Sequence, residues 1–250
     1  MEEFNIADFK PVEFSDKNVL LPWILRFNPM SCEYNFANLY CWSDVFQIKW
    51  MITNGRLWIF NGRLNSLGFP LGRSISFDEL FHISEQMRAA NYSGNIIQVP
   101  VEYVQKYKTI KHYFHLKIDE PNTEYIYSVK KLLELPGRKL HRKKNLINQF
   151  LRNHPHWLCK PMQINHFEQC LSLTDFWCEI KVCDKIAFGQ EMLALGKTFR
   201  KFDELEQSGL VLFTEGEMVA FSIFDRLNRN TADIHFEKYN PTIKGAAQII

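Results

Sequence analysis

The sequence predicts a mixed α/β or α+β protein that is organised as two domains. Two hairpin signals, at residues 46–60 and 209–225, alternate with stretches whose apolar residues recur at helical spacing. This mixture is typical of sheets flanked by helices. A chain of 250 residues is long enough for two domains that each bury a core. We place the boundary at Asp119-Glu120-Pro121-Asn122, which gives domains of residues 1–120 and 121–250.

The composition indicates a folded protein that stays in the cytoplasm. Hydrophobic residues make up 46% of the chain and aromatic residues 14%, which excludes a disordered protein. We see neither a signal peptide at the start nor an apolar run of the roughly 18 residues that a transmembrane helix needs. The six cysteines have neither CxxC nor Cys/His ligand spacing, so we expect free, mostly buried thiols and no metal site.

The first domain begins with a hairpin. Strands are expected at residues 46–53 and 56–60, on either side of an Asn54-Gly55 turn. A helix over residues 77–90 follows, with Ser76 as its N-cap and Glu79 completing a capping box. The remaining elements are a strand at 95–99, a short helix at 101–108 and a strand at 112–118.

The second domain places helices before and between its strands. Helices are expected at residues 125–135, 138–153, 165–182 and 185–207. Strands are expected at residues 156–160, 209–214, 218–225 and 231–236. A last helix starts near Pro241 and is cut at Ile250, so we expect the chain to be a fragment with an incomplete second domain.

Positive charge is concentrated in residues 138–144, where five of seven positions are Lys or Arg and one is His. On a helix of about 100° per residue, Lys143 falls within the apolar stripe and Lys144 at its edge. Arg138 and Arg142 fall on the opposite face. A solvated helix face, with long stems covering apolar surface, would explain this run. The alternative is that the first turn opens into a cleft, where these four cations hold phosphate groups.

A strand, a tight turn and a helix start carry a second signal, in "TADIHFEKYNPTIKGAAQII" from Thr231. Lys244, Gly245, Ala246 and Ala247 would form an anion cradle, with main-chain N–H groups pointing outward and small side chains admitting a pyrophosphate. The alternative is a plain turn in which glycine is needed for packing.

This order of hairpin, strand, turn and helix resembles the Gcn5-related N-acetyltransferase (GNAT) fold. That fold holds its donor's pyrophosphate on a loop of pattern Arg/Gln-x-x-Gly-x-Gly/Ala. Gly245 and Ala247 match the pattern, whereas Thr242 stands where it has Arg or Gln.

A resemblance to a narrower family covers most of the chain. It is carried by "EYIYSVKKLLELPGRKLHRKKNLINQFLRNHP", "GLVLFTEGEMVAFSIFD" and "ADIHFEKYNPTIKGAAQII", and by segments starting at Asn38 and Phe69. These segments look like an uncharacterised family of soluble bacterial proteins that is related to the C-terminal domain of phosphatidylglycerol lysyltransferase. The resemblance implies two tandem GNAT-like acyltransferase domains, with Fem-type peptidoglycan aminoacyltransferases among the relatives.

Three residues of the strand before the cradle are candidate catalytic groups. Glu237 would act as general base or bind an amine; the alternative is an ion pair with a neighbouring cation. His235 alternates with Asp233 and Glu237, so all three could face one cleft. For His235 we prefer a hydrogen-bonded, half-buried histidine. Tyr239 could protonate a leaving group, although a tyrosine there is more often a packing residue.

The resemblance implies acyl or aminoacyl transfer, with no tightly bound cofactor. The donor would be aminoacyl-tRNA or acyl-coenzyme A, and the acceptor an amine or hydroxyl of a small molecule, peptide or lipid head group. One rival is a coenzyme A-dependent N-acyltransferase. A second rival is a non-catalytic RNA- or phospholipid-binding module that uses the same basic run. We expect no DNA partner.

Overall fold

The structure is a computed structural model that describes residues 4–27, 29–120 and 123–250. Its contacts divide the chain into two compact units, Met1–Thr123 and Glu124–Ile250. The boundary expected from the sequence centres on Pro121-Asn122, which lie outside the described residues. Each unit is described by itself.

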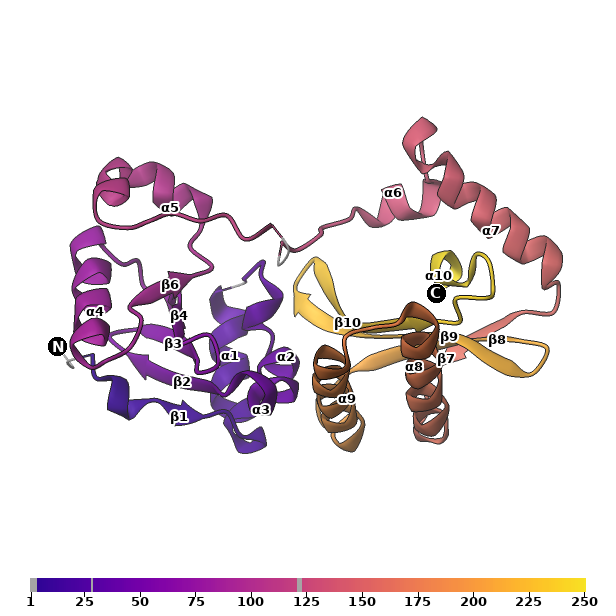
Figure 1. Ribbon diagram of the computed structural model, residues 1–250, viewed down its shortest axis with the longest axis horizontal. Helices are drawn as coiled ribbons and strands as arrows, with labels where there is room; N and C mark the ends of the chain where they lie inside the picture. Colours follow the sequence, from indigo (N-terminus) through magenta and orange to yellow (C-terminus); the bar gives the residue numbers. More distant parts are fainter. Residues whose placement is uncertain (1–3, 28, 121–122) are drawn as a thin grey trace. The chain divides into compact units, whose positions relative to one another are not determined.

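The described strands of the first unit form a six-stranded sheet in the order β1-β2-β3-β4-β6, with β5 beside β3 (Figure 1). The β4–β6 pair is parallel and the others are antiparallel. The strands are β1 (Lys10–Pro11), β2 (Ile48–Thr53), β3 (Arg56–Asn61), β4 (Ser66–Gly68), β5 (Leu71–Gly72) and β6 (Asn95–Ile97). The hairpin predicted around Asn54-Gly55 is confirmed: both turn residues have positive φ, which the two-residue hairpin needs.

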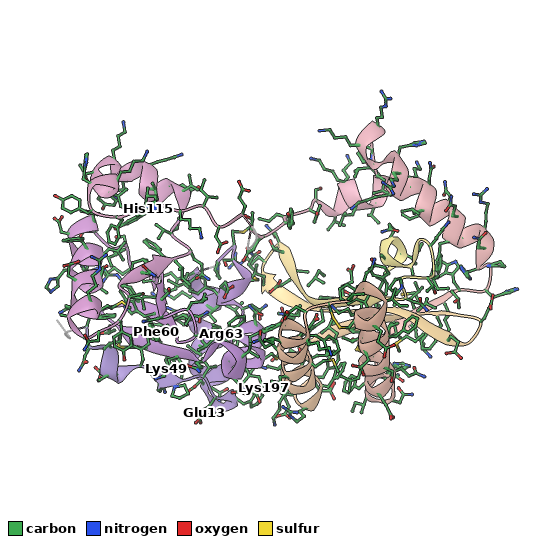
Figure 2. The ribbon with its side chains drawn as sticks, in the orientation of Figure 1. Glu13, Lys49, Phe60, Arg63, His115 and Lys197 are labelled. Atoms are coloured by element: carbon green, nitrogen blue, oxygen red, sulfur yellow. A yellow bond between two sulfur atoms is a disulfide. The ribbon has the colours of Figure 1, made fainter. Side chains whose placement is uncertain are left out.

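The helices of the first unit are α1 (Lys17–Phe27), α2 (Phe36–Cys41), α3 (Ser43–Phe46), α4 (Phe77–Ala89) and α5 (Val101–Lys106), with 3₁₀ turns η1 (Ile6–Asp8), η2 (Phe14–Asp16), η3 (Cys32–Tyr34) and η4 (Lys108–His112). The sequence analysis missed α1 to α3. The predicted strand at 112–118 is wrong, because residues 113–118, which include His115 in Figure 2, are largely exposed and belong to no described ladder.

One core cluster of the first unit lies between α4 and the sheet. Trp58, Leu67 and Met87 are buried there, together with Phe60, which is labelled in Figure 2. The predicted cap of α4 is half confirmed. Ser76 accepts the N–H of Glu79, but the Glu79 carboxylate turns away from Ser76 to pair with the buried Arg56 guanidinium at 2.5 and 2.9 Å.

The second unit is a four-stranded antiparallel sheet in the order β10-β9-β8-β7. Its strands are β7 (Leu158–Pro161), β8 (Ser208–Thr214), β9 (Glu217–Asn228) and β10 (Thr231–Tyr239). Its helices are α6 (Val129–Glu134), α7 (His141–Asn153), α8 (Phe167–Lys181), α9 (Lys185–Arg200) and α10 (Ala246–Ile249), with 3₁₀ turns η6 (Arg138–Leu140) and η7 (Ile164–His166). A mixed fold with helices flanking sheets is confirmed.

Different helices cover the two faces of this sheet. Figure 1 shows α8 and α9 on one side and α7 and α10 on the other. On the α7 side, Phe150 and Ala246 pack on Leu212 and Ala220 of the sheet. Because successive residues of a strand alternate between faces, Phe221 and Ile223 point to the α8 side, where both are fully buried.

Several boundaries of the second unit differ from the prediction. Residues 138–140 form a 3₁₀ turn after Gly137, so the α-helix starts at His141. The last helix starts at Ala246, not near Pro241, because the Asn240 side chain accepts the Thr242 N–H and holds the chain in a turn. The helix expected at 125–135 spans only α6, and the helix expected to reach residue 207 ends at Arg200. No helix among the described residues is both long and apolar enough to cross a membrane.

The expectation that all six cysteines are free is wrong. Cys178 in the last turn of α8 is bonded to Cys183, with the two Cα atoms 5.2 Å apart. Val182, between them, is left-handed and ends the helix, and this reversal brings the two thiols together. Spacing along the sequence does not reveal such a reversal.

A buried histidine caps the turn that leads into α8. His166 is 4% exposed, and its Nδ1 accepts the Gln163 N–H at 2.9 Å. Burial, reinforced by the charge of Lys160, lowers the pKa of His166 below its ordinary value of 6.5. The neutral ring is therefore the form that the fold favours.

We predict that acid weakens the second unit through His166. Because the folded pKa is below the unfolded one, the unfolded chain binds the proton more readily, and the free energy of unfolding falls as the pH drops through and below about 6.5. His166→Asn keeps a hydrogen-bond acceptor but does not titrate in this pH range. Urea unfolding between pH 7.5 and 5.5 should therefore show a smaller loss of unfolding free energy in this variant than in wild type. The exposed His156→Asn is the control, and equal slopes in all three proteins would contradict the prediction.

Candidate functional site

A shift in the pairing of β10 with β9 decides on which face of the sheet each polar residue of β10 lies. Asp233 lies opposite Asp225 and Ile234 opposite Phe224, but Phe236 lies opposite Ile223. His235 is the extra residue of a β-bulge. Such a bulge changes which face the following side chains occupy.

The bulge separates the candidates that the sequence placed together. Residues directly opposite each other share a face. Asp233 lies opposite Asp225 and Glu237 opposite Ser222, and these partners are three positions apart on a regular part of β9. Asp233 and Glu237 therefore point to opposite faces. The expectation that Asp233, His235 and Glu237 face one cleft is wrong, because it assumed an uninterrupted alternation.

Glu237 lies on the α7 side, within the electrostatic reach of Lys143. Partial burial raises the pKa of the Glu237 carboxyl above its ordinary value, and the charges of Lys143 and Lys238 act against that rise. The side chain is still exposed to solvent. Lys143, which the helical spacing singled out, therefore acts electrostatically on the strand carboxylate.

Lys143 belongs to the basic run of residues 138–144. Arg138 is in the 3₁₀ turn, while Arg142, Lys143 and Lys144 are in the first turn of α7, and all four side chains are exposed. No carboxylate of the described chain lies within 4 Å of these cations or of Lys139. The positive end of the α7 dipole adds to this charge. The cations and the dipole therefore repel one another, and a bound anion would relieve that repulsion.

The turn before α10 has a packing role. Gly245 has a φ of +92°, and a Cβ atom there would overlap the Leu146 carbonyl oxygen and lie 2.7 Å from Phe150 Cβ. The glycine therefore lets the turn press against α7. Ala246 is fully buried in the same contact.

The other candidates of this turn differ in exposure. Lys244 is exposed and Ala247 half-buried, while Tyr239 packs against the cluster around Phe150. The Ala246 N–H is already bonded to the Ile243 carbonyl. Whether these residues hold a donor stays a prediction.

On the α8 side, His235 lies between two aspartates. Its Nε2 is 3.1 Å from Asp225 Oδ1 and its Nδ1 is 3.9 Å from Asp233 Oδ2. Burial alone would lower the pKa of His235, but the two carboxylates outweigh it and the net shift is upward. Burial also raises the pKa of Asp233, with Asp225 and Glu124 adding to that rise and His235 opposing it.

The sequence analysis missed the setting of Lys238. This side chain is buried on the α8 side, where its Nζ lies 2.6 Å from Glu191 and 4.4 Å from the centre of the Trp177 ring. Glu191 is 47 positions away in the chain and Trp177 is further still, so no local sequence pattern predicts these contacts. A hollow on α7, lined by Asn145, Asn148, Gln149, Leu151 and Arg152, also lay outside the predicted site.

Comparison with known proteins assigns a family. The family model described as phosphatidylglycerol lysyltransferase, C-terminal, matches residues 26–250. The chain belongs to this family. A curated relative, an uncharacterised protein of Mycoplasmoides gallisepticum, is 28% identical over 138 residues, which are 53% of this chain and 43% of that protein. The chain thus matches less than half the length of this relative.

Solved structures show the same fold. A conserved protein of unknown function from Bacteroides thetaiotaomicron is 23% identical with a TM-score of 0.84, over 97% of this chain and 83% of that one. The C-terminal domain of a proposed lysylphosphatidylglycerol synthetase from Agrobacterium fabrum is 13% identical with a TM-score of 0.53, over 92% of this chain and 70% of that one. These likenesses concern the fold alone.

We predict that Gly245 of this family member is needed for stability. Gly245→Ala adds both left-handed strain and an overlap with α7, whereas Gly216→Ala adds the strain alone, since a Cβ at Gly216 meets no atom within 4 Å. The overlap should make Gly245→Ala the more costly by about 1–3 kcal/mol in the free energy of unfolding. Urea unfolding measures both variants. An equal loss in the two would argue against the packing role.

We also predict an electrostatic coupling between α7 and β10. Since Lys143 lowers the pKa of Glu237, Lys143→Ala should raise that pKa further, as measured by NMR titration of the labelled carboxyl. Lys144→Ala is the matched control and should leave the Glu237 titration where it is. A Glu237 titration that responds equally to both changes would contradict the placement of Lys143.

Proposed function

We propose that the chain is an acyltransferase that holds the phosphates of its donor at the start of α7, and that this donor is aminoacyl-tRNA. The observation that supports the proposal is the run of exposed cations at Arg138, Arg142, Lys143 and Lys144, of which Lys143 acts electrostatically on Glu237. Exposed cations that have no carboxylate within 4 Å among the described residues suit a polyanion, because phosphate contacts release counterions. The family, named after a lysyltransferase, supports the same reaction class.

Glu237 would serve as the general base of this reaction. The acceptor's hydroxyl or amine attacks the carbonyl carbon of the aminoacyl ester, and its proton passes to the carboxylate. The new ester or amide bond forms as the bond to the tRNA ribose oxygen breaks, and that oxygen takes up a proton. In this scheme Tyr239 supplies that proton and then takes up a new one from solvent, while Glu237 releases its own proton to solvent. Because Glu237 is exposed, an acceptor can reach it.

The finer fold assignment belongs to the same proposal. We infer that each unit is a GNAT-like domain and that the reaction takes place in the second. A cytoplasmic location, where charged tRNA is made, is also part of it. The acceptor would carry a hydroxyl or an amine, on a small molecule, a peptide or a lipid head group.

A coenzyme A-dependent N-acyltransferase is the second candidate. Gly245 and Ala247 match the pyrophosphate loop pattern, which favours it. The contact of Gly245 with α7, however, explains the glycine without a ligand. A non-catalytic RNA- or phospholipid-binding module would use the same exposed cations.

The binding experiment compares two double variants of equal charge. Arg142→Ala/Lys143→Ala removes two cations from the basic run, and Lys181→Ala/Lys185→Ala removes two exposed cations from α8 and α9. Each is titrated with charged tRNA, uncharged tRNA and acetyl-coenzyme A at several salt concentrations. Of the three ligands, we expect charged tRNA to bind wild type most tightly. The plot of log K against log salt should become shallower by about 1–2 in the first variant only, because fewer phosphate contacts release fewer counterions.

The transfer experiment tests Glu237. Glu237→Gln should keep charged-tRNA binding and lower the transfer rate by about 100-fold or more, while the exposed Glu217→Gln leaves it unchanged. Transfer from acetyl-coenzyme A without RNA would select the N-acyltransferase. Binding without any transfer would select the binding module. An absence of binding would leave the basic run as a solvated face.

A further inference from the structure

Three potential metal ligands meet on the β9–β10 hairpin, away from the proposed acyl-transfer site. Asp225, Asp233 and His235 each offer one ligand atom, and these atoms lie within 4.8 Å of one another. They lie on the α8 side of the sheet, whereas Glu237 lies on the α7 side. The cluster is therefore separate from the site of the proposed function.

The cluster is nearly closed to solvent, and two polar atoms of Asp233 and His235 lack a hydrogen-bond partner within the described chain. The side chains of His235, Asp225 and Asp233 are 3%, 11% and 13% exposed. Within the described chain, Asp233 Oδ2 has no hydrogen-bond partner, and His235 Nε2 meets Asp225 Oδ1 at 3.1 Å as an ion-pair contact without hydrogen-bond geometry. Buried polar atoms of this kind are rare in native proteins and call for a ligand or an unusual charge state.

The two carboxylates of the cluster also lie on neighbouring strands of the hairpin. Asp225 and Asp233 lie directly opposite each other on neighbouring strands, an arrangement that is unfavourable for two like charges. A divalent cation would balance both and would leave His235 neutral and free to coordinate.

We propose that Asp225, Asp233 and His235 bind one divalent transition-metal ion of the Zn²⁺ type. One imidazole nitrogen and two carboxylate oxygens are a donor set that suits Zn²⁺, with a fourth position left for water. Tetrahedral bonds of about 2.0–2.2 Å place ligand atoms about 3.4 Å apart. The three ligand atoms now lie within 4.8 Å of one another, so small side-chain movements would bring them to the distances that a bound ion requires. The ion would join β9 to β10 at the bulge.

Two measurements on the full chain test the site. After removal of metal with a chelator, calorimetric titration with ZnCl₂ should show one ion bound per chain and a higher unfolding temperature for the loaded protein. Titrations with MnCl₂ and MgCl₂ in parallel give the metal preference, and we expect Zn²⁺ to bind tightest. X-ray absorption at the zinc edge should show nitrogen and oxygen neighbours only.

Variants locate the binding. His235→Gln and Asp233→Asn should each weaken Zn²⁺ binding at least about tenfold, because even outer-shell changes cost about that much. The exposed His156→Gln and Asp203→Asn are matched controls and should bind as wild type does. Circular dichroism checks that each variant is folded, and Asp225→Asn, which keeps the side-chain shape, replaces either variant that is not.

Three results would overturn the proposal. They are no saturable Zn²⁺ binding by folded wild-type protein, sulfur among the neighbours of the bound zinc, and equal weakening in the control variants. The first would leave His235 as an imidazolium paired with the two aspartates. The second would assign the zinc to cysteines such as Cys32 or Cys159, which are partly exposed. None of these outcomes bears on tRNA binding or transfer.

Discussion

The extra residue at His235 determines how the second sheet presents its polar groups. Without it, Asp233, His235 and Glu237 would share one face. With it, the aspartate and histidine point toward the α8 side and Glu237 toward α7. One strand can therefore carry two chemically different sites, a carboxylate next to cations on one face and a closed Asp-His cluster on the other. Bulges recur next to functional sites because they re-aim side chains in this way.

The position of the basic run depends on a second constraint, the contact between α7 and the turn before α10. Gly245 allows that contact, and Phe150 and Ala246 fill it. The contact holds α7 over the face that carries Glu237, so the first turn of the helix reaches the strand carboxylate. Packing in the interior of α7, at Leu146 and Phe150, thus sets the electrostatics of its first turn. The glycine that the pattern associated with a donor has a structural use of its own.

Local signals predicted the elements that are determined locally. The Asn54-Gly55 hairpin, α4 with its Ser76 cap, and strands β7 to β10 were all predicted within a few residues. The elements that were missed or misplaced are those that need a distant partner. Residues 112–118 have a strand-like composition but no neighbouring strand, and a strand without a partner has no ladder. The Cys178–Cys183 disulfide depends on the reversal at Val182.

By itself the sequence determined the mixed fold, the charge concentration at residues 138–144 and the helical position that puts Lys143 near the apolar stripe. These are consequences of periodicity and composition, which need no tertiary information. Only the tertiary structure decided which residues influence one another: the charge of Lys143 acts on Glu237, Lys238 contacts Glu191 and Trp177, and His235 lies between two aspartates. The physical reason is register. A shift of one residue in a strand exchanges its faces, and the sequence of that strand alone does not record the pairing that produces the shift.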